Sequence, residues 1–215
     1  MDDVFSEFDL VLTAFWLTIE LLLISGVLSM LFGTLLAAAR VGPIPVLAKA
    51  GALYVLLVRN TPLLIVFIFI FFGLPQLDVR LPFLAKGVLA LTVYTSAFVC
   101  EAMRAGVNAV PLGQAEASRA IGLTFGQSMR FVVLPQALRA VVPPLASVFI
   151  ALAKNTSVAA GFGLLEATAR MRYFTNNNAD DRTWIFVTFA LGYILIVELI
   201  SAGAFSLERR WKVAR

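Results

Sequence analysis

Residues 13–39 read TAFWLTIELLLISGVLSMLFGTLLAAA, a stretch in which Glu20 is the single charged side chain. A helix of about 20 apolar residues is long enough to cross the hydrocarbon core of a bilayer. Apolar blocks of similar length recur after this stretch, and the charged residues collect between them. This arrangement is typical of membrane-spanning helices. The stretch therefore predicts the first span of an all-α polytopic membrane protein.

The composition of the whole chain supports this prediction. Hydrophobic residues make up 60% and charged residues 14% of the 215 residues, and the mean hydropathy is +0.92. A typical soluble domain has fewer apolar and more charged residues, so we expect a single transmembrane domain over residues 1–215. The formal charge of +4 does not indicate a nucleic-acid partner, because the basic residues stand beside apolar blocks and form no soluble patch.

The apolar blocks predict five spans embedded in the lipid bilayer when each must supply about 20 residues of low polarity. Basic residues follow the first block, separate the third from the fourth, and close the chain. The positive-inside rule places these segments in the cytoplasm, which predicts an outside N-terminus and a cytoplasmic C-terminus in a bacterial inner membrane. The expected spans are Thr13–Ala39, Leu53–Leu74, Val88–Gly106, Ala140–Phe162 and Trp184–Leu207.

Residue types that several other functions require are missing. The chain has no histidine and one cysteine, Cys100. Histidine-dependent catalysis, an internal disulfide and a His/Cys metal site are therefore excluded. An intramembrane enzyme would have to use Lys154 as the base for Ser157. The sequence also contains no GxxxxGK[ST] loop to bind ATP phosphates. We expect no catalytic residue and no metal site.

The segment between the third and fourth spans, residues 108–135, predicts a helical hairpin on the cytoplasmic side. Pro111 suits the start of a helix, Gly122 can end it, and Thr124 can cap a second helix that runs toward Leu134. From periodicity alone, an amphipathic hairpin that lies on lipid headgroups is as good an interpretation as a rigid element that contacts a partner protein.

Four short motifs, in this order along the chain, resemble those of permease subunits of polar amino acid ABC importers, and the glutamate-type permeases are the most similar. The hairpin motif is similar to the EAA loop of that family, with Ser118 in place of the second alanine. The resemblance extends over nearly the whole chain. The motifs are RNTPL at 59–63, EAMRAG at 101–106, QAEASRAIGLT at 114–124 with LPQA at 134–137, and KNTS at 154–157.

The resemblance implies a type I ABC importer permease fold with five spanning helices and a cytoplasmic coupling helix. The chain would form the pathway for glutamate or a similar polar amino acid together with a second permease chain, identical or homologous. A cytoplasmic ABC ATPase dimer would bind ATP and Mg²⁺ and contact the hairpin, and an extracytoplasmic amino-acid-binding protein would deliver the substrate. The chain itself would need no cofactor.

The resemblance also implies two sets of functional residues. The coupling set combines small side chains for close packing with charges and apolar anchors. The pathway set supplies charges and hydrogen-bonding groups. The coupling set is Glu116, Ala117, Ser118, Arg119, Gly122, Leu123 and Phe125, and the pathway set is Arg59, Thr61, Glu101, Lys154, Asn155, Thr156 and Ser157.

Lys154 is placed by helical rise roughly 20 Å from the inner edge of the membrane, where a charge requires a partner or water. A substrate carboxylate is one such partner. The alternative is an internal ion pair with Glu20, Glu101 or Glu198, or contact with helix carbonyls.

Arg59 is expected inside the second span, because Leu63–Leu74 is too short to cross the bilayer alone. At roughly 9 Å from the inner edge its long side chain can reach the interface, so a structural anchor is as good an interpretation as a role in the pathway. Pro62 is expected to bend this helix. Glu101 and Arg104 stand one turn apart, and we expect them to form an ion pair that packs or gates the helices.

An autonomous secondary transporter or channel is the main alternative function, because charges inside spans are equally natural in such proteins. The hairpin favours the ABC permease, since a gradient-driven carrier has no need of an element that couples to an ATPase.

Overall fold

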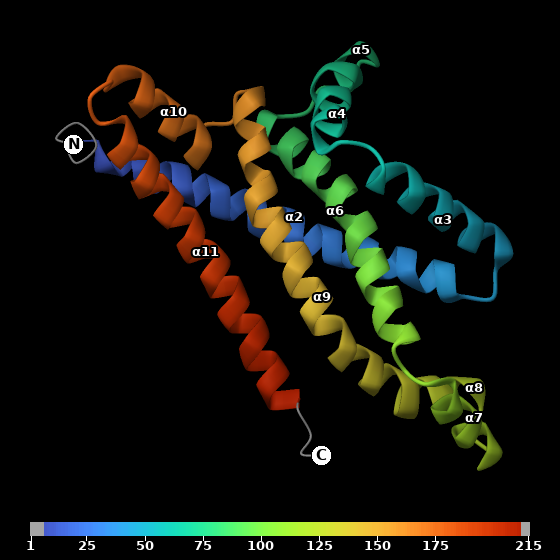
Figure 1. Ribbon diagram of the computed structural model, residues 1–215. Coiled ribbons are helices and arrows are strands. Elements are labelled where there is room, and N and C mark those ends of the chain that lie inside the picture. The colour runs from blue at the N-terminus through green and yellow to red at the C-terminus, as the bar shows by residue number, and fades with distance from the viewer. Residues whose placement is uncertain (1–6, 212–215) are drawn as a thin grey trace.

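The computed structural model describes residues 7–211, and this part of the chain is almost entirely helical, with no strand (Figure 1). Four helical stretches are long and apolar enough to cross a bilayer, and one bent pair of helices can make a fifth. The predicted all-α polytopic fold is thus confirmed. Four terminal charges that bear on the orientation, those of Asp2, Asp3, Lys212 and Arg215, lie outside the described residues. The candidate spans are α2 (Phe8–Val41), the bent pair Pro45–Arg59 and Leu63–Gln76, α6 (Phe83–Asn108), the run Phe125–Phe162, and α11 (Arg182–Trp211).

Small residues allow α2 to pack closely against α6, and α2 crosses α6 obliquely (Figure 1). The buried residues Ser25, Ser29, Gly33 and Ala37 recur at every fourth position and so share one face of the helix. A Cβ atom added at Gly33 would lie 2.5 Å from the Cβ of Val99, so the two backbones approach too closely for any side chain there. Small residues at this spacing are typical of helix pairs in membranes.

The second apolar block differs from the prediction of one helix over Leu53–Leu74. It contains two helical segments that meet at an angle of 104°. Pro62 is the cause, because a proline disfavours helical geometry in the residue before it and cannot donate a backbone hydrogen bond. Pro62 therefore bends the chain as predicted, but so sharply that Arg59 ends one helix instead of lying within a continuous span. The segments are α3 (Pro45–Arg59), α4 (Leu63–Ile68), η1 (Phe69–Gly73) and α5 (Leu74–Gln76).

Two π-helical turns each precede a Leu-Pro-Gln sequence. The turn η1 is followed by residues 74–76, and η2 (Met129–Val133) is followed by residues 134–136. In an α-helix the proline ring clashes with the carbonyl four residues earlier, and a π-turn moves that carbonyl away. The same local sequence therefore explains both irregularities.

The second helix of the predicted hairpin continues into the fourth span as one helical run, Phe125–Phe162. The hairpin lies at one end of the bundle, and α10, which precedes α11, lies at the other end (Figure 1). In the main hydrophobic core, Phe67 and Phe71 pack against Phe162. The remaining elements are α7 (Leu112–Ala120), α8 (Phe125–Ser128), α9 (Leu134–Asn155), η3 (Thr156–Phe162) and α10 (Ala167–Asn177).

Candidate coupling hairpin and translocation site

The turn between α7 and α8 has the chemistry that the sequence predicts. Gly122 has a φ of +91°, in the left-handed region that glycine enters without a steric penalty. The Leu123 N–H donates to the Ser118 carbonyl at 3.1 Å and the Gly122 N–H to the Arg119 carbonyl at 3.0 Å, which is a Schellman C-cap. Thr124 then begins α8 with a capping box. The turn of the hairpin is therefore formed by hydrogen bonds between residues close in the sequence.

Ser118, the residue that departs from the EAA pattern, joins the two helices of the hairpin. Its side chain is buried, and its Oγ lies 2.8 Å from the Ala115 carbonyl and 2.8 Å from the Oγ of Ser128 in α8. A shared hydroxyl between two buried serines holds α7 against α8 and leaves neither polar group unsatisfied. The hairpin can therefore move as one rigid element.

The other predicted coupling residues lie mostly on the surface of the hairpin. Leu123 is half-buried and the rest are exposed. Within the described part of the chain no salt bridge joins Glu116 to Arg119, so both charges are free to contact another protein. The exposed members are Glu116, Ala117, Arg119, Gly122 and Phe125.

Residues of α6 line three cavities that follow one another along the helix: Leu89 and Val93 line the first, and Phe98 lines the other two, one of them together with Glu101. The first cavity, of about 420 Å³, lies between α6 and α4 and includes Thr61. The other two share Phe98. One, of about 380 Å³, lies against α9 and includes Asn155, and the other, of about 520 Å³, lies against α3 and includes Arg59 and Glu101. Four of the predicted pathway residues, Arg59, Thr61, Glu101 and Asn155, thus line cavities beside α6.

Lys154 and Ser157 line a separate cavity of about 290 Å³ between α9, α10 and α11. Its walls are completed by Thr168, Met171, Phe186, Phe189, Ala190 and Tyr193. Lys154 and the next residue, Asn155, therefore face different cavities. Thr156 is fully buried and its hydroxyl donates to the carbonyl of Ala153, so it serves the local structure of the helix end.

The internal ion pairs considered for Lys154 do not form. Among the salt bridges of the described residues, none joins Lys154 to Glu20, Glu101 or Glu198. Lys154 is exposed on the isolated chain, where it borders its cavity. Its ammonium group therefore remains available for a carboxylate that enters the cavity.

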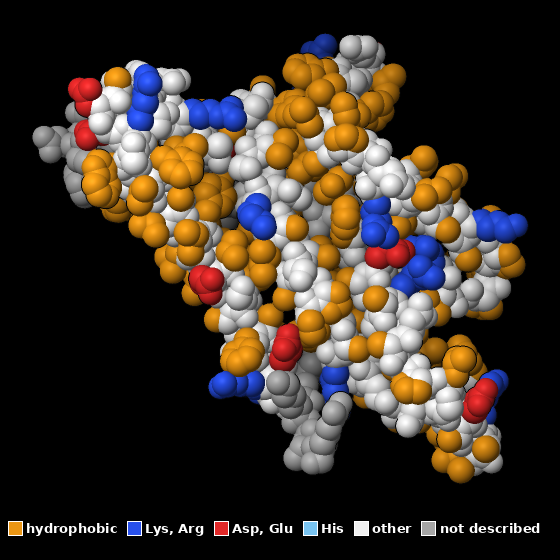
Figure 2. Space-filling view, in the orientation of Figure 1, with side chains coloured by type: hydrophobic (Ala, Val, Ile, Leu, Met, Phe, Trp, Pro, Cys, Tyr) orange, Lys and Arg blue, Asp and Glu red, His pale blue; other side chains and the backbone are white. Residues whose placement is uncertain are grey.

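Glu101 is the centre of a cluster of three arginines from three helices. Its carboxylate accepts hydrogen bonds from Arg40 of α2 and Arg104 of α6, and it lies 3.2 Å from an Nη1 atom of Arg59 in α3. The Arg59 guanidinium also lies over the ring of Phe98, 5.6 Å from its centre. The pairing with Arg104 confirms the sequence prediction. Figure 2 shows acidic and basic side chains together between α3 and α6, on a face that is otherwise largely hydrophobic.

Glu166 is a functional candidate that the sequence interpretation missed. Its side chain is fully buried, accepts the Ala169 N–H at 3.0 Å as the N-cap of α10, and accepts the Tyr193 hydroxyl at 2.7 Å. Burial raises its pKa, because the ionised form loses hydration. Tyr193 lines the Lys154 cavity, so Glu166 fixes one of its walls. The only sequence signal is a carboxylate at a helix start, which is common on protein surfaces.

Lys86 was also missed, since it stands at the edge of the predicted third span. Its side chain is 9% exposed, and its ammonium lies 5.6 Å from the ring centre of Phe71 and 5.5 Å from that of Phe83. Cation–π contacts of this length stabilise a buried ammonium. Lys86 thereby helps to hold η1 against α6.

A helical bundle with four or five membrane-capable stretches, a hairpin at one end and cavities along its spans has the architecture of a membrane transport subunit. A family described as the inner membrane component of binding-protein-dependent transport systems matches residues 29–213, and the chain belongs to this family. It is therefore a multi-pass inner membrane protein, and the permease subunits of this family leave ATP hydrolysis to a partner ATPase.

Curated relatives and solved structures place the chain among amino acid ABC permeases. It is 39% identical to the glutamate transport system permease protein GluC of Corynebacterium glutamicum over 95% of both chains. It is 37% identical to the probable glutamine ABC transporter permease protein GlnP of Bacillus subtilis over 91% of both. A crystal structure of an amino acid ABC transporter with histidines matches with a TM-score of 0.89 and 27% identity over 97% of both chains. The resemblance is thus confirmed, and the autonomous carrier is set aside.

Proposed function

We propose that this chain forms the membrane pathway of an importer for glutamate or a similar polar amino acid, together with a second permease chain that is identical or homologous. The observation that carries the substrate assignment is the identity of 39% and 40% to two glutamate transport system permeases over 95% of the chain. Relatives named for glutamine, at 37% and 36% identity, make the neutral amide the nearest competing substrate.

The proposed partners are a cytoplasmic ABC ATPase dimer, which binds ATP and Mg²⁺, and an extracytoplasmic binding protein. The hairpin formed by α7 and α8 contacts the ATPase through its exposed surface. In support, the hairpin and the end of α11 lie at the same end of the bundle, opposite α10 (Figure 1). Together with the basic residues around the hairpin, this arrangement supports an outside N-terminus and a cytoplasmic C-terminus.

Within the pathway, Lys154 is proposed to bind a carboxylate of the substrate. Lys154 borders a cavity whose walls also include Ser157, Thr168 and Tyr193, and the hydroxyls of these three residues are hydrogen-bonded within the chain. No salt bridge of the described residues holds the Lys154 ammonium, and a cation at a cavity suits the carboxylate of an amino acid, which must replace its hydration shell when it enters the membrane. Asn155 and the polar residues along α6 then offer further contacts toward the hairpin end.

The test is uptake of radiolabelled glutamate by the assembled complex in liposomes, with ATP and the binding protein. We expect Lys154→Ala to lower uptake by roughly tenfold to a hundredfold, the value of a lost charge-assisted hydrogen bond, while the ATPase stays bound. Lys49→Ala, an exposed lysine of α3 that lines none of the cavities described here, is the matched control.

Normal glutamate uptake by Lys154→Ala would overturn the assignment of Lys154. Failure of the variant to assemble with the ATPase would give Lys154 a structural role instead. Competition by unlabelled glutamine against glutamate separates the acidic from the amide substrate.

A further inference from the structure

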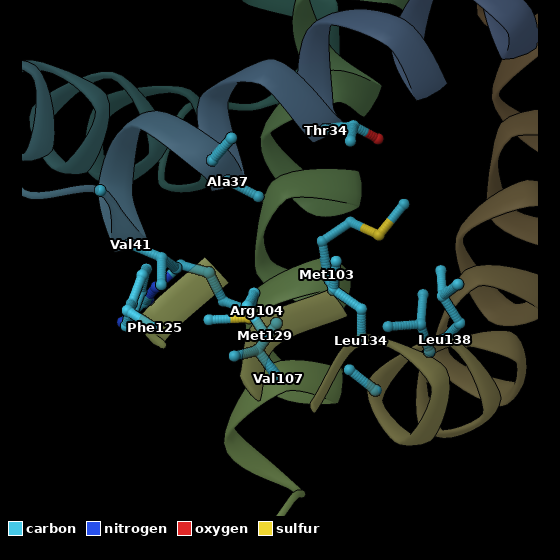
Figure 3. Close-up of a pocket in the computed structure, with 14 residues that line it drawn as sticks. Thr34, Ala37, Val41, Met103, Arg104, Val107, Phe125, Met129, Leu134 and Leu138 are labelled. Atoms are coloured by element: carbon cyan, nitrogen blue, oxygen red, sulfur yellow. The ribbon is translucent and has the colours of Figure 1, made fainter. Parts of the chain in front are cut away.

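An apolar cavity of about 330 Å³ lies between the hairpin and the spans, outside the proposed pathway. The end of α2 contributes Ala37 and Val41, the end of α6 contributes Met103 and Val107, and the run from α8 to α9 closes the other side (Figure 3). Phe125, a predicted ATPase anchor, lines this cavity together with Val41 of α2 (Figure 3). The cavity is open to the surroundings of the bundle.

The lining determines which chemical groups this cavity accepts. Thr34 and Arg104 are its only polar side chains. An amino acid would lose its hydration there without gaining enough hydrogen bonds, so the cavity does not suit the transported substrate. A hydrocarbon chain has no hydrogen bonds with water to lose when it enters the cavity, and it fills the space with dispersion contacts. In a chain that crosses a bilayer, the hydrocarbon available at every open apolar surface is the lipid acyl chain.

The charges around the cavity favour a lipid with an anionic headgroup. Arg104 lines the cavity, and it shares the Glu101 carboxylate with two other arginines. One carboxylate cannot neutralise three guanidinium groups, so positive charge remains beside the cavity. Further along the chain from Arg104 to Arg139, Glu116 is the single acidic residue and Arg119 and Arg130 add positive charge. Such juxtamembrane basic groups attract anionic headgroups.

We propose that this cavity binds an acyl chain of an anionic phospholipid from the leaflet on the hairpin side, with the lipid phosphate beside Arg104. The site is separate from the cavities of the proposed pathway, and it does not depend on which amino acid the importer carries. Its walls come from the hairpin, from the ends of α2 and α6, and from the start of α9. The lipid therefore occupies the junction across which movement of the hairpin reaches the spans.

A direct test labels the cavity in the assembled permease–ATPase complex. Ala38, an exposed lining residue, is replaced by cysteine and coupled to benzophenone maleimide, while the native Cys100 is fully buried and stays unlabelled. The complex is placed in vesicles of phosphatidylcholine and phosphatidylglycerol in equal amounts and irradiated. We expect mass spectrometry to find a lipid adduct enriched in phosphatidylglycerol. A cross-link to the ATPase or to the second permease chain would show that a protein fills the cavity and would overturn the proposal.

A second measurement uses a filled cavity. Ala38→Trp places an indole in the opening, and Leu35→Trp places the same group one turn away on α2, at an exposed residue outside the lining. Each buried methylene strengthens lipid binding about fourfold, so excluding two of them predicts a roughly fifteenfold loss of phosphatidylglycerol affinity. Native mass spectrometry of the complex measures the retained lipid. Equal retention by Ala38→Trp, Leu35→Trp and the unmodified complex, or retention without preference for the anionic lipid, would contradict the proposed site.

Discussion

Replacing Glu101 by glutamine should destabilise the chain through the charges that it leaves behind. The substitution keeps the size of the side chain and removes the single carboxylate that Arg40, Arg59 and Arg104 share. The three guanidinium groups would then face one another at the junction of α2, α3 and α6. Like charges held this close repel, and the cost rises as the groups become less hydrated.

The magnitude follows from how exposed each ion pair is. The Arg40 side chain is 13% exposed, whereas Arg59 and Arg104 are 44% and 32% exposed. Removing one partner of a buried pair costs about 3–5 kcal/mol, and an exposed pair is worth about 0–1 kcal/mol. The pair with Arg40 is therefore the dominant contribution. We expect Glu101→Gln to lower the free energy of unfolding by about 2–3 kcal/mol, equivalent to a fall in Tm of roughly 4–12 °C for a chain of this length.

The assay is thermal unfolding of the purified complex in detergent, followed by tryptophan fluorescence. Glu198→Gln, at an exposed glutamate of α11 that joins none of these salt bridges, is the matched control and should leave the Tm unchanged. In the double variant Glu101→Gln/Arg40→Gln one excess charge is gone, so part of the lost stability should return. A Tm of Glu101→Gln equal to that of the control would refute the reasoning. A double variant less stable than Glu101→Gln alone would also refute it, because repulsion would not then be the cause.

Three further predictions concern packing, the hairpin turn and pH. Gly106→Val should lower the free energy of unfolding by about 1–3 kcal/mol, since even a Cβ at Gly106 would lie 2.0 Å from a methyl carbon of Val141. An unchanged Tm would show that α6 and α9 can separate freely. Gly122→Ala should destabilise the hairpin by about 1–2 kcal/mol and weaken ATPase binding, because alanine is strained at the φ of +91°. Gly113→Ala is the control and should change neither, since a Cβ at either glycine meets open space and Gly113 has no positive φ. Pull-down of the ATPase compares the two variants. The folded-state pKa of Glu166 is raised above its unfolded value, near 4.5. Its contribution to stability is therefore full below the unfolded pKa and is lost as pH rises through the folded pKa. Glu166→Gln should remove this dependence of Tm on pH.

The features that the sequence predicted well depend on chemistry within a few residues. Gly122 and Thr124 end one helix and begin the next through hydrogen bonds to their immediate neighbours. Pro62 disfavours helical geometry in the residue before it, so the bend was predictable. Its angle of 104° was not, because hydropathy reports where apolar residues are and not the direction in which they run.

The interactions that the sequence did not predict join residues far apart along the chain. Arg40 and Glu101 are separated by 61 positions, and Glu166 and Tyr193 by 27. No local pattern pairs such residues, because their contact is created by the packing of α2, α6, α10 and α11. The same reason explains why Lys154 and Asn155, neighbours in one motif, line different cavities: the helix directs consecutive side chains to different neighbouring helices.

The helical run Phe125–Phe162 joins the proposed ATPase contact to the proposed substrate cavity. Its 38 residues span about 57 Å if straight, from the hairpin to the cavities at Lys154 and Asn155. The serine pair makes the hairpin rigid, so a movement there must be absorbed further along the run. Pro143 and Pro144 lie between the two ends and lack the N–H groups that would stiffen the helix. Bending at these prolines would change the angle between the hairpin end and the cavity end, which is the kind of change that the proposed coupling to an ATPase requires.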